Sequence, residues 1–224
     1  MHPTAFTMIT TLRRGLAAVL IGLLATSLPA IAQGLGPNGL PLNPDAAPQA
    51  RVGTKPSGSS SNAGSSLDEL MAWERQDMGV RAPQGLHAGA MHGPTPNQIA
   101  GGQVITTKGL LPLLRQREMP VHVIDVLGDA RSLPRAVPAA WAAQAGSFDD
   151  ETQQQLAQML RQLTRGSNDT PLVFYCAGPE CWMSYNAAVR AIRLGYRNVV
   201  WYRGGLEAWQ RAGLPLAQAG WAAR

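Results

Sequence analysis

The sequence contains little cysteine, since Cys176 and Cys181 are the only two among 224 residues. Two cysteines are too few for the multiple cross-links that hold small disulfide-rich secreted domains together. The fold must therefore depend on an ordinary hydrophobic core, and a chain of this length has room for one or two domains. The cysteines favour a chemical interpretation instead, because only four residues separate them.

Long apolar runs are also missing, and a comfortable membrane span takes about 20 residues. The most apolar stretch, residues 15–28, is shorter than that and follows Arg13 and Arg14. It ends just before a small-residue sequence, Ala-Ile-Ala, at 30–32. A basic start, a short apolar middle and such an ending predict a secretory signal peptide over residues 1–32, with an uncleaved anchor helix as the alternative. We therefore expect a periplasmic or secreted protein without membrane attachment after cleavage.

Lysine is scarce as well, because Lys55 and Lys108 are the only two and no dense basic block occurs. The formal net charge is +5, and removal of residues 1–32 leaves 17 basic and 14 acidic residues, a net charge of +3. Nucleic-acid binding requires clustered charges that neutralise phosphates. We therefore expect no nucleic-acid partner.

Two segments precede the main domain. Residues 33–65 are rich in Gly, Pro, Ser, Asn and Ala and hold almost no large apolar residue, which predicts a disordered linker. Ser66 and Glu69 have the spacing of a capping box, so residues 66–93 are expected to form a short helix, ending near Gly79, and a loop.

From residue 94 onward, apolar strand patterns alternate with helical ones. The predicted strands are 103–106, 121–126, 171–175 and 198–202, and the predicted helices are one capped by Thr107, one through 156–163, then 184–194 and 206–212. This alternation predicts an α/β domain over residues 94–218, with a parallel sheet flanked by helices on both sides. In such sheets a ligand binds beyond the carboxyl ends of the strands.

Both cysteines fall at that edge. Cys176 directly follows a short, wholly apolar strand, and a helix is expected to begin near Ser184. A loop that leads into a helix N-terminus directs backbone N–H groups and partial positive charge towards a thiolate, which lowers its pKa and makes it a usable nucleophile. Cys176 and Cys181 are the candidate catalytic residues. The candidate substrate-binding residues are Ala177, Gly178, Glu180, Trp182, Met183 and Ser184.

Residues 172–216 carry a family resemblance. They combine the apolar strand, the cysteine loop, a helix with two alanines and three motifs: Leu-Gly-Tyr-Arg-Asn-Val at 194–199, Gly-Gly-Leu-Glu-Ala-Trp at 204–209 and Gly-Leu-Pro-Leu at 213–216. This combination resembles a rhodanese domain. The resemblance implies sulfur transfer, in which Cys176 accepts a sulfane sulfur as a persulfide and passes it to a thiol acceptor. The loop lacks the Arg or Lys of many thiosulfate-using relatives and carries Glu180 instead, so thiosulfate is expected to be a poor donor.

A narrower resemblance rests on the segment 181–188, Cys-Trp-Met-Ser-Tyr-Asn-Ala-Ala, and on Trp201-Tyr202. It is similar to exported rhodanese-like proteins with a Cys…Cys-Trp motif that accompany PQQ-dependent alcohol catabolism. The gap of four residues between the cysteines is longer than in that group. The resemblance implies, as a further partner, a protein of a periplasmic oxidation system.

Three functions follow as alternatives. The first is a periplasmic sulfurtransferase or persulfide carrier that uses Cys176 and takes a small sulfur donor or thiol acceptor as partner. The second is a thiol–disulfide redox module in which Cys181 resolves Cys176, and the third is a non-catalytic binding domain that assists a PQQ-dependent oxidation system. No cofactor or metal is expected. His87 and His92, in a Gly-rich loop, are interpreted as chance neighbours and not as metal ligands.

Three other residue types are interpreted as packing, hydrogen-bonding or surface residues. Trp182 and Trp209 are expected to pack in the core, and Asp125 to accept hydrogen bonds at a strand end. The arginines of one helical stripe are expected to face solvent; they are Arg190, Arg193 and Arg197.

Overall fold

The computed structural model describes residues 61–116 and 120–219, with residues 61–65 described by their backbone alone. The predicted signal peptide and most of the predicted linker lie outside these residues. The elements in chain order are α1 (Ser61–Glu74), β1 (Gln103–Val104), α2 (Thr107–Arg115), β2 (His122–Asp125), β3 (Arg131–Ser132), β4 (Val137–Pro138), the 3-10 helix η1 (Ala140–Ala143), α3 (Glu151–Thr164), β5 (Leu172–Tyr175), α4 (Met183–Arg193), β6 (Val199–Tyr202), α5 (Gly205–Arg211) and β7 (Ala217–Gln218). Among them, no helix has the length and apolar character needed to cross a bilayer.

Five strands form one sheet in the order β1-β6-β5-β2-β4, and every neighbouring pair is parallel. Strand β5 lies at its centre, with Val173 paired to Val123 of β2 and to Val200 of β6. Strands β3 and β7 form a separate antiparallel pair. The parallel α/β fold predicted from the sequence is confirmed.

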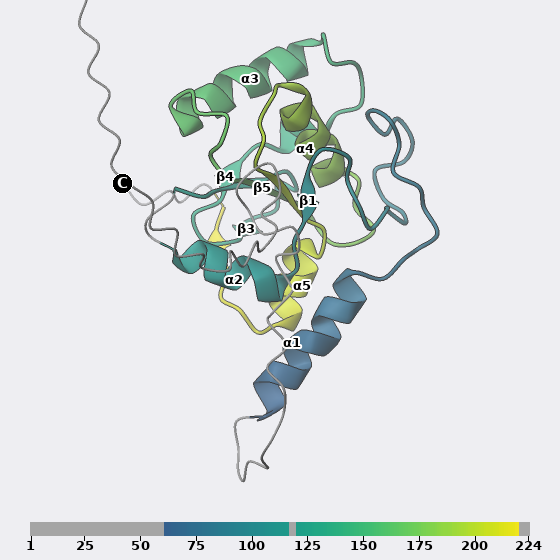
Figure 1. Ribbon diagram of the computed structural model, residues 1–224, viewed down its shortest axis with the longest axis vertical. Coiled ribbons are helices and arrows are strands. Elements are labelled where there is room, and N and C mark those ends of the chain that lie inside the picture. Colours follow the sequence, from purple (N-terminus) through teal and green to yellow (C-terminus); the bar gives the residue numbers. More distant parts are fainter. Residues whose placement is uncertain (1–60, 117–119, 220–224) are drawn as a thin grey trace, which may run out of the picture. The chain divides into compact units, whose positions relative to one another are not determined.

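Helices cover both faces of this sheet, as Figure 1 shows, with α3 and α4 on one side and α2 and α5 on the other. The central strand alternates accordingly. Its residues Leu172 and Phe174 join the core beneath α3 and α4, whereas Val173 and Tyr175 join the core beneath α1, α2 and α5. All four are fully buried, which explains why this strand reads as an uninterrupted apolar run.

The first helix differs from the prediction. Helix α1 begins at Ser61, so Ser66 lies within it and the predicted capping box does not open it. The helix also ends at Glu74, before Gly79. Glu74 is buried and its carboxylate accepts hydrogen bonds from the Thr107 backbone N–H, at 2.9 Å, and from the Thr107 hydroxyl, at 2.8 Å.

This contact also corrects the predicted cap of α2. Thr107 is the first residue of the helix and Thr106 is its N-cap, without a side-chain capping bond. The acceptor at this helix end is the carboxylate that α1 supplies. A carboxylate satisfies the free N–H groups of a helix start and interacts favourably with the helix dipole, so no local hydroxyl is needed.

The predicted solvated arginine stripe is wrong for Arg190, which is fully buried within α4, whereas Arg193 and Arg197 are exposed as predicted. Arg190 donates to both carboxylate oxygens of Asp150, at 2.8 and 2.7 Å, and to the carbonyl of Ser147 at 2.9 Å. The Arg190 guanidinium lowers the pKa of Asp150 to about 2. Asp150 also caps α3 by accepting from the Gln153 N–H, so this ion pair ties α3 to α4.

Candidate functional site

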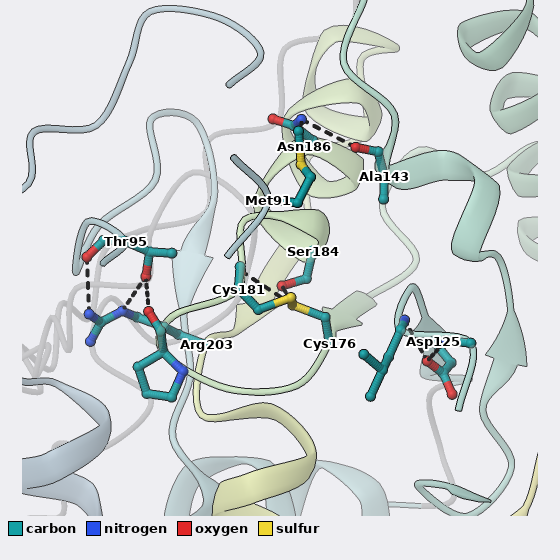
Figure 2. Close-up of a disulfide and its surroundings, with 12 residues drawn as sticks. Met91, Thr95, Asp125, Ala143, Cys176, Cys181, Ser184, Asn186 and Arg203 are labelled. Carbon is teal, nitrogen blue, oxygen red and sulfur yellow. Dashed lines mark hydrogen bonds between the residues drawn. A yellow bond between two sulfur atoms is a disulfide. The ribbon is translucent and has the colours of Figure 1, made fainter. Parts of the chain in front are cut away.

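The two cysteines lie at the carboxyl edge of the sheet, where the sequence placed them. Cys176 follows the last residue of β5, and Cys181 lies five residues later, before α4. Their sulfurs form a disulfide with a Cα–Cα distance of 6.4 Å, and each residue is only 1% exposed. Figure 2 shows this disulfide with the side chains around it. The pair is therefore a buried disulfide.

A short polar chain contacts the sulfur of Cys176. The Ser184 hydroxyl, in the first turn of α4, lies 3.0 Å from the Cys176 Sγ. The indole N–H of Trp201, on β6, donates to the Ser184 Oγ at 2.9 Å. All three residues are buried. The first helical turn and a neighbouring strand thus hold one hydroxyl against one of the two sulfurs.

Helix α5 supports the other side of the loop. The Leu206 N–H donates to the Cys176 carbonyl at 2.9 Å, and the Glu207 N–H donates to the Ala177 carbonyl at 2.8 Å. Gly205, with φ of +57°, brings the backbone so close that an added Cβ would collide with the Cys176 carbonyl. Only glycine combines this left-handed conformation with such an approach. The second glycine of the 204–209 motif therefore shapes the cysteine loop.

A strap covers the loop from outside, and we use this name for residues 83–95. Its main chain bonds directly to the loop: the Gly93 N–H donates to the Glu180 carbonyl at 2.8 Å, and the Trp182 N–H donates to the Met91 carbonyl at 3.0 Å. His92 and Cys181 form an isolated antiparallel bridge. The strap thus pairs with residues 180–182 of the loop through its main chain.

Side chains fasten the middle of the strap. The His87 ring stacks on Trp182, with ring centroids 3.9 Å apart and an interplanar angle of 8°. The buried Asn186 side chain accepts from the His87 N–H at 2.8 Å and donates to the His87 carbonyl at 2.9 Å. It also donates to the Ala143 carbonyl at 3.2 Å. One amide side chain therefore links the strap, α4 and η1.

Arg203 fastens the end of the strap. It is 1% exposed and donates from Nε to the Thr95 hydroxyl and from Nη2 to the Thr95 carbonyl, both at 3.0 Å. Its Nη1 donates to the carbonyls of Glu74 and Gln76, at 2.7 and 3.0 Å. The Thr95 hydroxyl in turn donates to the Pro179 carbonyl in the cysteine loop. Burial lowers the pKa of Arg203, whereas nearby Asp77 raises it.

All three nitrogens of Arg203 therefore donate within the fold, to Thr95, Glu74 and Gln76. The loop itself contributes Glu180, which is exposed, and Gly178 lies beside the Glu207 carboxylate of α5. Glu207 is itself paired with Arg211, with 2.5 Å between the Glu207 Oε1 and the Arg211 Nη2.

The predicted site residues separate into three groups. Cys176, Cys181 and Ser184 are in contact at the centre. Trp182 and Glu180 bond to the strap, and Trp182 also packs edge-on against Tyr185, in agreement with the predicted packing role. The third group lies in or next to the loop and consists of Ala177, Gly178 and the half-buried Met183.

The predicted structural roles of Asp125 and Trp209 are confirmed. Asp125 is buried and accepts from the Leu127 N–H at 2.8 Å at the end of β2. Trp209 is buried and donates to the Pro215 carbonyl. Within the two described ranges, no group of three or more His, Cys, Asp or Glu side chains is arranged to hold a metal ion. His87 is more than a chance neighbour, however, because it stacks on Trp182.

The strap and its two fastenings were missed by the sequence reasoning. Asn186 and Trp201 do occur within the motifs of the narrower resemblance, which is the only signal that marked them. Arg203 is a single arginine after a strand, and no local pattern distinguishes it from a surface residue. Its partners lie 108 and 129 residues away in the chain.

Three comparisons with known proteins place the chain among its relatives as follows. The rhodanese-like domain family matches residues 113–212. A search of curated proteins finds no match. Two solved structures are similar to the chain. The BH2092 protein from Bacillus halodurans is 21% identical, with a TM-score of 0.38, over 52% of this chain and 77% of that one. A protein of unknown function from Rhodopseudomonas palustris, described as a possible tyrosine phosphatase, is 19% identical, with a TM-score of 0.37, over 73% of this chain and 100% of that one.

The match over residues 113–212 includes β2, β5, β6 and the whole cysteine loop. The five-stranded parallel sheet with helices on both faces fits the same fold. Residues 113–212 therefore match a rhodanese-like domain, and this match supports a function in the sulfurtransferase family or a related one.

Proposed function

We propose that the protein is a sulfur carrier in which reduced Cys176 accepts a sulfane sulfur and the Cys176–Cys181 disulfide is the resting form. The observation that carries this proposal is the buried disulfide at the carboxyl end of β5, with the Ser184 hydroxyl against the Cys176 sulfur. Rhodanese-like chemistry requires a cysteine at this place. The second cysteine at bonding distance supplies a way to protect or to discharge it.

The reaction begins after a dithiol reductant has delivered two electrons and two protons to the disulfide. The Cys176 thiolate then attacks the outer sulfur of a persulfide donor, R–S–SH, so that a bond to this sulfur forms and the donor leaves as the thiolate RS⁻. Cys176 now carries the persulfide. An acceptor thiolate attacks the outer sulfur and restores the Cys176 thiolate.

Cys181 provides the alternative outcome. Its thiolate attacks the inner sulfur of the Cys176 persulfide, the disulfide forms again, and hydrosulfide, HS⁻, leaves. Transfer to an acceptor thiol returns Cys176 to the thiolate without further reductant. Release of hydrosulfide re-forms the disulfide, so each such turnover consumes one equivalent of the dithiol reductant. The cysteine loop carries Glu180 and neither Arg nor Lys, which favours uncharged or protein-bound donors over thiosulfate.

A thiol–disulfide redox module is the second candidate, and the disulfide itself favours it. In this case electrons pass between the cysteine pair and a partner dithiol, and no sulfur atom is carried. The two candidates differ in whether the reduced protein gains the mass of a sulfur atom.

The predicted signal peptide supports a periplasmic or secreted site of action, and the Cys…Cys-Trp resemblance supports a role beside a PQQ-dependent oxidation system. An oxidising compartment would keep the pair as a disulfide until a reductant arrives. A silent binding role in the same system would leave the cysteines dispensable. A strain in which both cysteines are replaced by serine would then grow on alcohols like the wild type, whereas we expect impaired growth.

The deciding experiment exposes reduced protein to a small organic persulfide and follows the intact mass. We expect the Cys181→Ser variant to retain one added sulfur atom, because no internal thiol discharges it. The wild type should release sulfide and return to the disulfide, and Cys176→Ser should gain no sulfur. Rapid oxidation of the wild type by a disulfide substrate, with no sulfur gain in Cys181→Ser, would favour the redox module. Sulfur loading of Cys176→Ser would refute Cys176 as the acceptor.

A further inference from the structure

Three buried side chains, Trp201, Ser184 and Cys176, contact one another in succession beside the disulfide. Trp201 is 0% exposed, and Ser184 and Cys176 are each 1% exposed. The Trp201 Nε1 lies 2.9 Å from the Ser184 Oγ, which lies 3.0 Å from the Cys176 Sγ. Figure 2 shows the Ser184 hydroxyl directed at the sulfur of Cys176.

The donors in this arrangement follow from the chemistry of the groups. An indole N–H only donates, so the Ser184 oxygen is the acceptor of the bond from Trp201. A hydroxyl has a single proton. In the disulfide the Cys176 sulfur has no proton to give, so the Ser184 O–H donates to it. The same O–H is in place to donate to a thiolate when the bond is reduced.

We infer that Ser184, oriented by Trp201, is a positioning residue that makes Cys176 the more acidic thiol of the pair. A hydrogen bond donated to an anion stabilises the charged form and lowers its pKa. Within the described part of the chain no hydrogen-bond donor contacts the Cys181 sulfur, so the effect is specific to one sulfur. The incoming sulfur atom is thereby directed to Cys176 and the resolving step to Cys181. This inference rests on the proposed use of Cys176 as the nucleophile.

Several ionisable groups lie in the cysteine loop or on the elements around it. The loop and α5 contribute Glu180 and Glu207, and the strap contributes His92, which bridges to Cys181. Arg203 follows β6, and Asp125 ends β2. Three further ionisable residues lie on elements packed against the loop, namely His87, Glu74 and Tyr185. All of them remain when only Ser184 is changed, so a variant at this position isolates the hydroxyl.

The test uses the Cys181→Ser background, which leaves one thiol. The pKa of Cys176 is measured from thiolate absorbance against pH, with the protein lacking both cysteines as the blank for tyrosine. We expect Ser184→Ala to raise the pKa by about one unit, a tenfold loss of thiolate below the pKa. Ser184→Thr, which keeps the hydroxyl, should restore the original pKa. Trp201→Phe should give a smaller rise, because the hydroxyl stays but loses its orientation.

A second measurement uses both thiols. Reduced protein receives less than one equivalent of iodoacetamide, and peptide mass spectrometry shows which cysteine reacts. We expect Cys176 to dominate in the parent and the preference to shift towards Cys181 in Ser184→Ala. An unchanged Cys176 pKa in Ser184→Ala, or in the folded Trp201→Phe variant if Ser184→Ala does not fold, would overturn the inference. These readouts need no sulfur transfer. If Ser184→Ala raises the Cys176 pKa as expected but the protein gains no sulfur from a persulfide donor, the proposed function is refuted and the role of Ser184 stands.

Discussion

Access to the disulfide should be controlled by Asn186, because this residue fastens the strap over the loop. The change Asn186→Ala removes its two hydrogen bonds to the His87 backbone. A typical intramolecular hydrogen bond contributes about 1 kcal/mol net, so the closed strap should lose about 2 kcal/mol relative to the open one. Since 1.4 kcal/mol corresponds to a tenfold change, the open population should rise roughly thirtyfold.

The assay is the rate at which a small dithiol reduces the disulfide, with alkylation to trap the thiols. If the strap opens and closes rapidly, this rate is proportional to the open population and should also rise roughly thirtyfold. His87→Ala is a graded comparison, because it removes the stack on Trp182 and keeps both backbone bonds to Asn186. We expect a smaller increase for this variant.

The matched control is Asn168→Ala, which changes an exposed asparagine far along the chain from the strap and should leave the rate unchanged. Asn186 also bonds to Ala143, so the free energy of unfolding is measured for each variant with urea. If the reduction rates of the variants change only in proportion to their free energies of unfolding, the disulfide is reached by global unfolding and not by opening of the strap. Reduction of Asn186→Ala at the wild-type rate would refute the strap as the barrier to the cysteines.

Three further predictions concern acid stability, the loop and export. The buried Arg190 lowers the pKa of Asp150 from 3.8 to about 2, so the charge of Asp150 stabilises the fold above about pH 4, and this stabilisation is lost as the pH falls towards 2. In urea unfolding at decreasing pH, Asp150→Asn should therefore lose less stability over that range than the wild type, and equal losses would contradict the ion pair. Gly205→Ala should destabilise the fold by about 1–3 kcal/mol through its left-handed φ and the collision with the Cys176 carbonyl. The control Gly213→Ala has a φ of +66° and open space around its Cβ, so urea unfolding should show a smaller loss, and equal losses would mean that the collision is relieved without cost. N-terminal sequencing of protein from the periplasm or medium should begin at or near Gln33, and a chain starting at Met1 in the soluble cytoplasmic fraction would exclude export.

Local patterns in the sequence were sufficient for the sheet and for the place of the cysteines. The run at 172–175 is apolar at every position because both of its faces are covered, and the four principal strands were each predicted within a few residues. The short antiparallel pair of β3 and β7 and the edge strand β4 were not predicted from the sequence. They are two residues long, and β4 contains Pro138, which a sheet tolerates at its edge.

Only the tertiary structure decided what surrounds the disulfide. Arg190 has the local context of a surface arginine, yet its partner Asp150 comes from another helix and makes its burial possible. Asn186 meets His87 across 99 residues of sequence, and Arg203 meets Thr95 across 108. Periodicity reports which face of an element is apolar, because that depends on neighbours three or four positions away. It carries no information about which distant polar groups meet, since those pairs form only when the whole domain has folded. The sequence by itself thus determined where Cys176 and Cys181 lie, and the folded chain determined that a strap covers them and that Ser184 contacts Cys176.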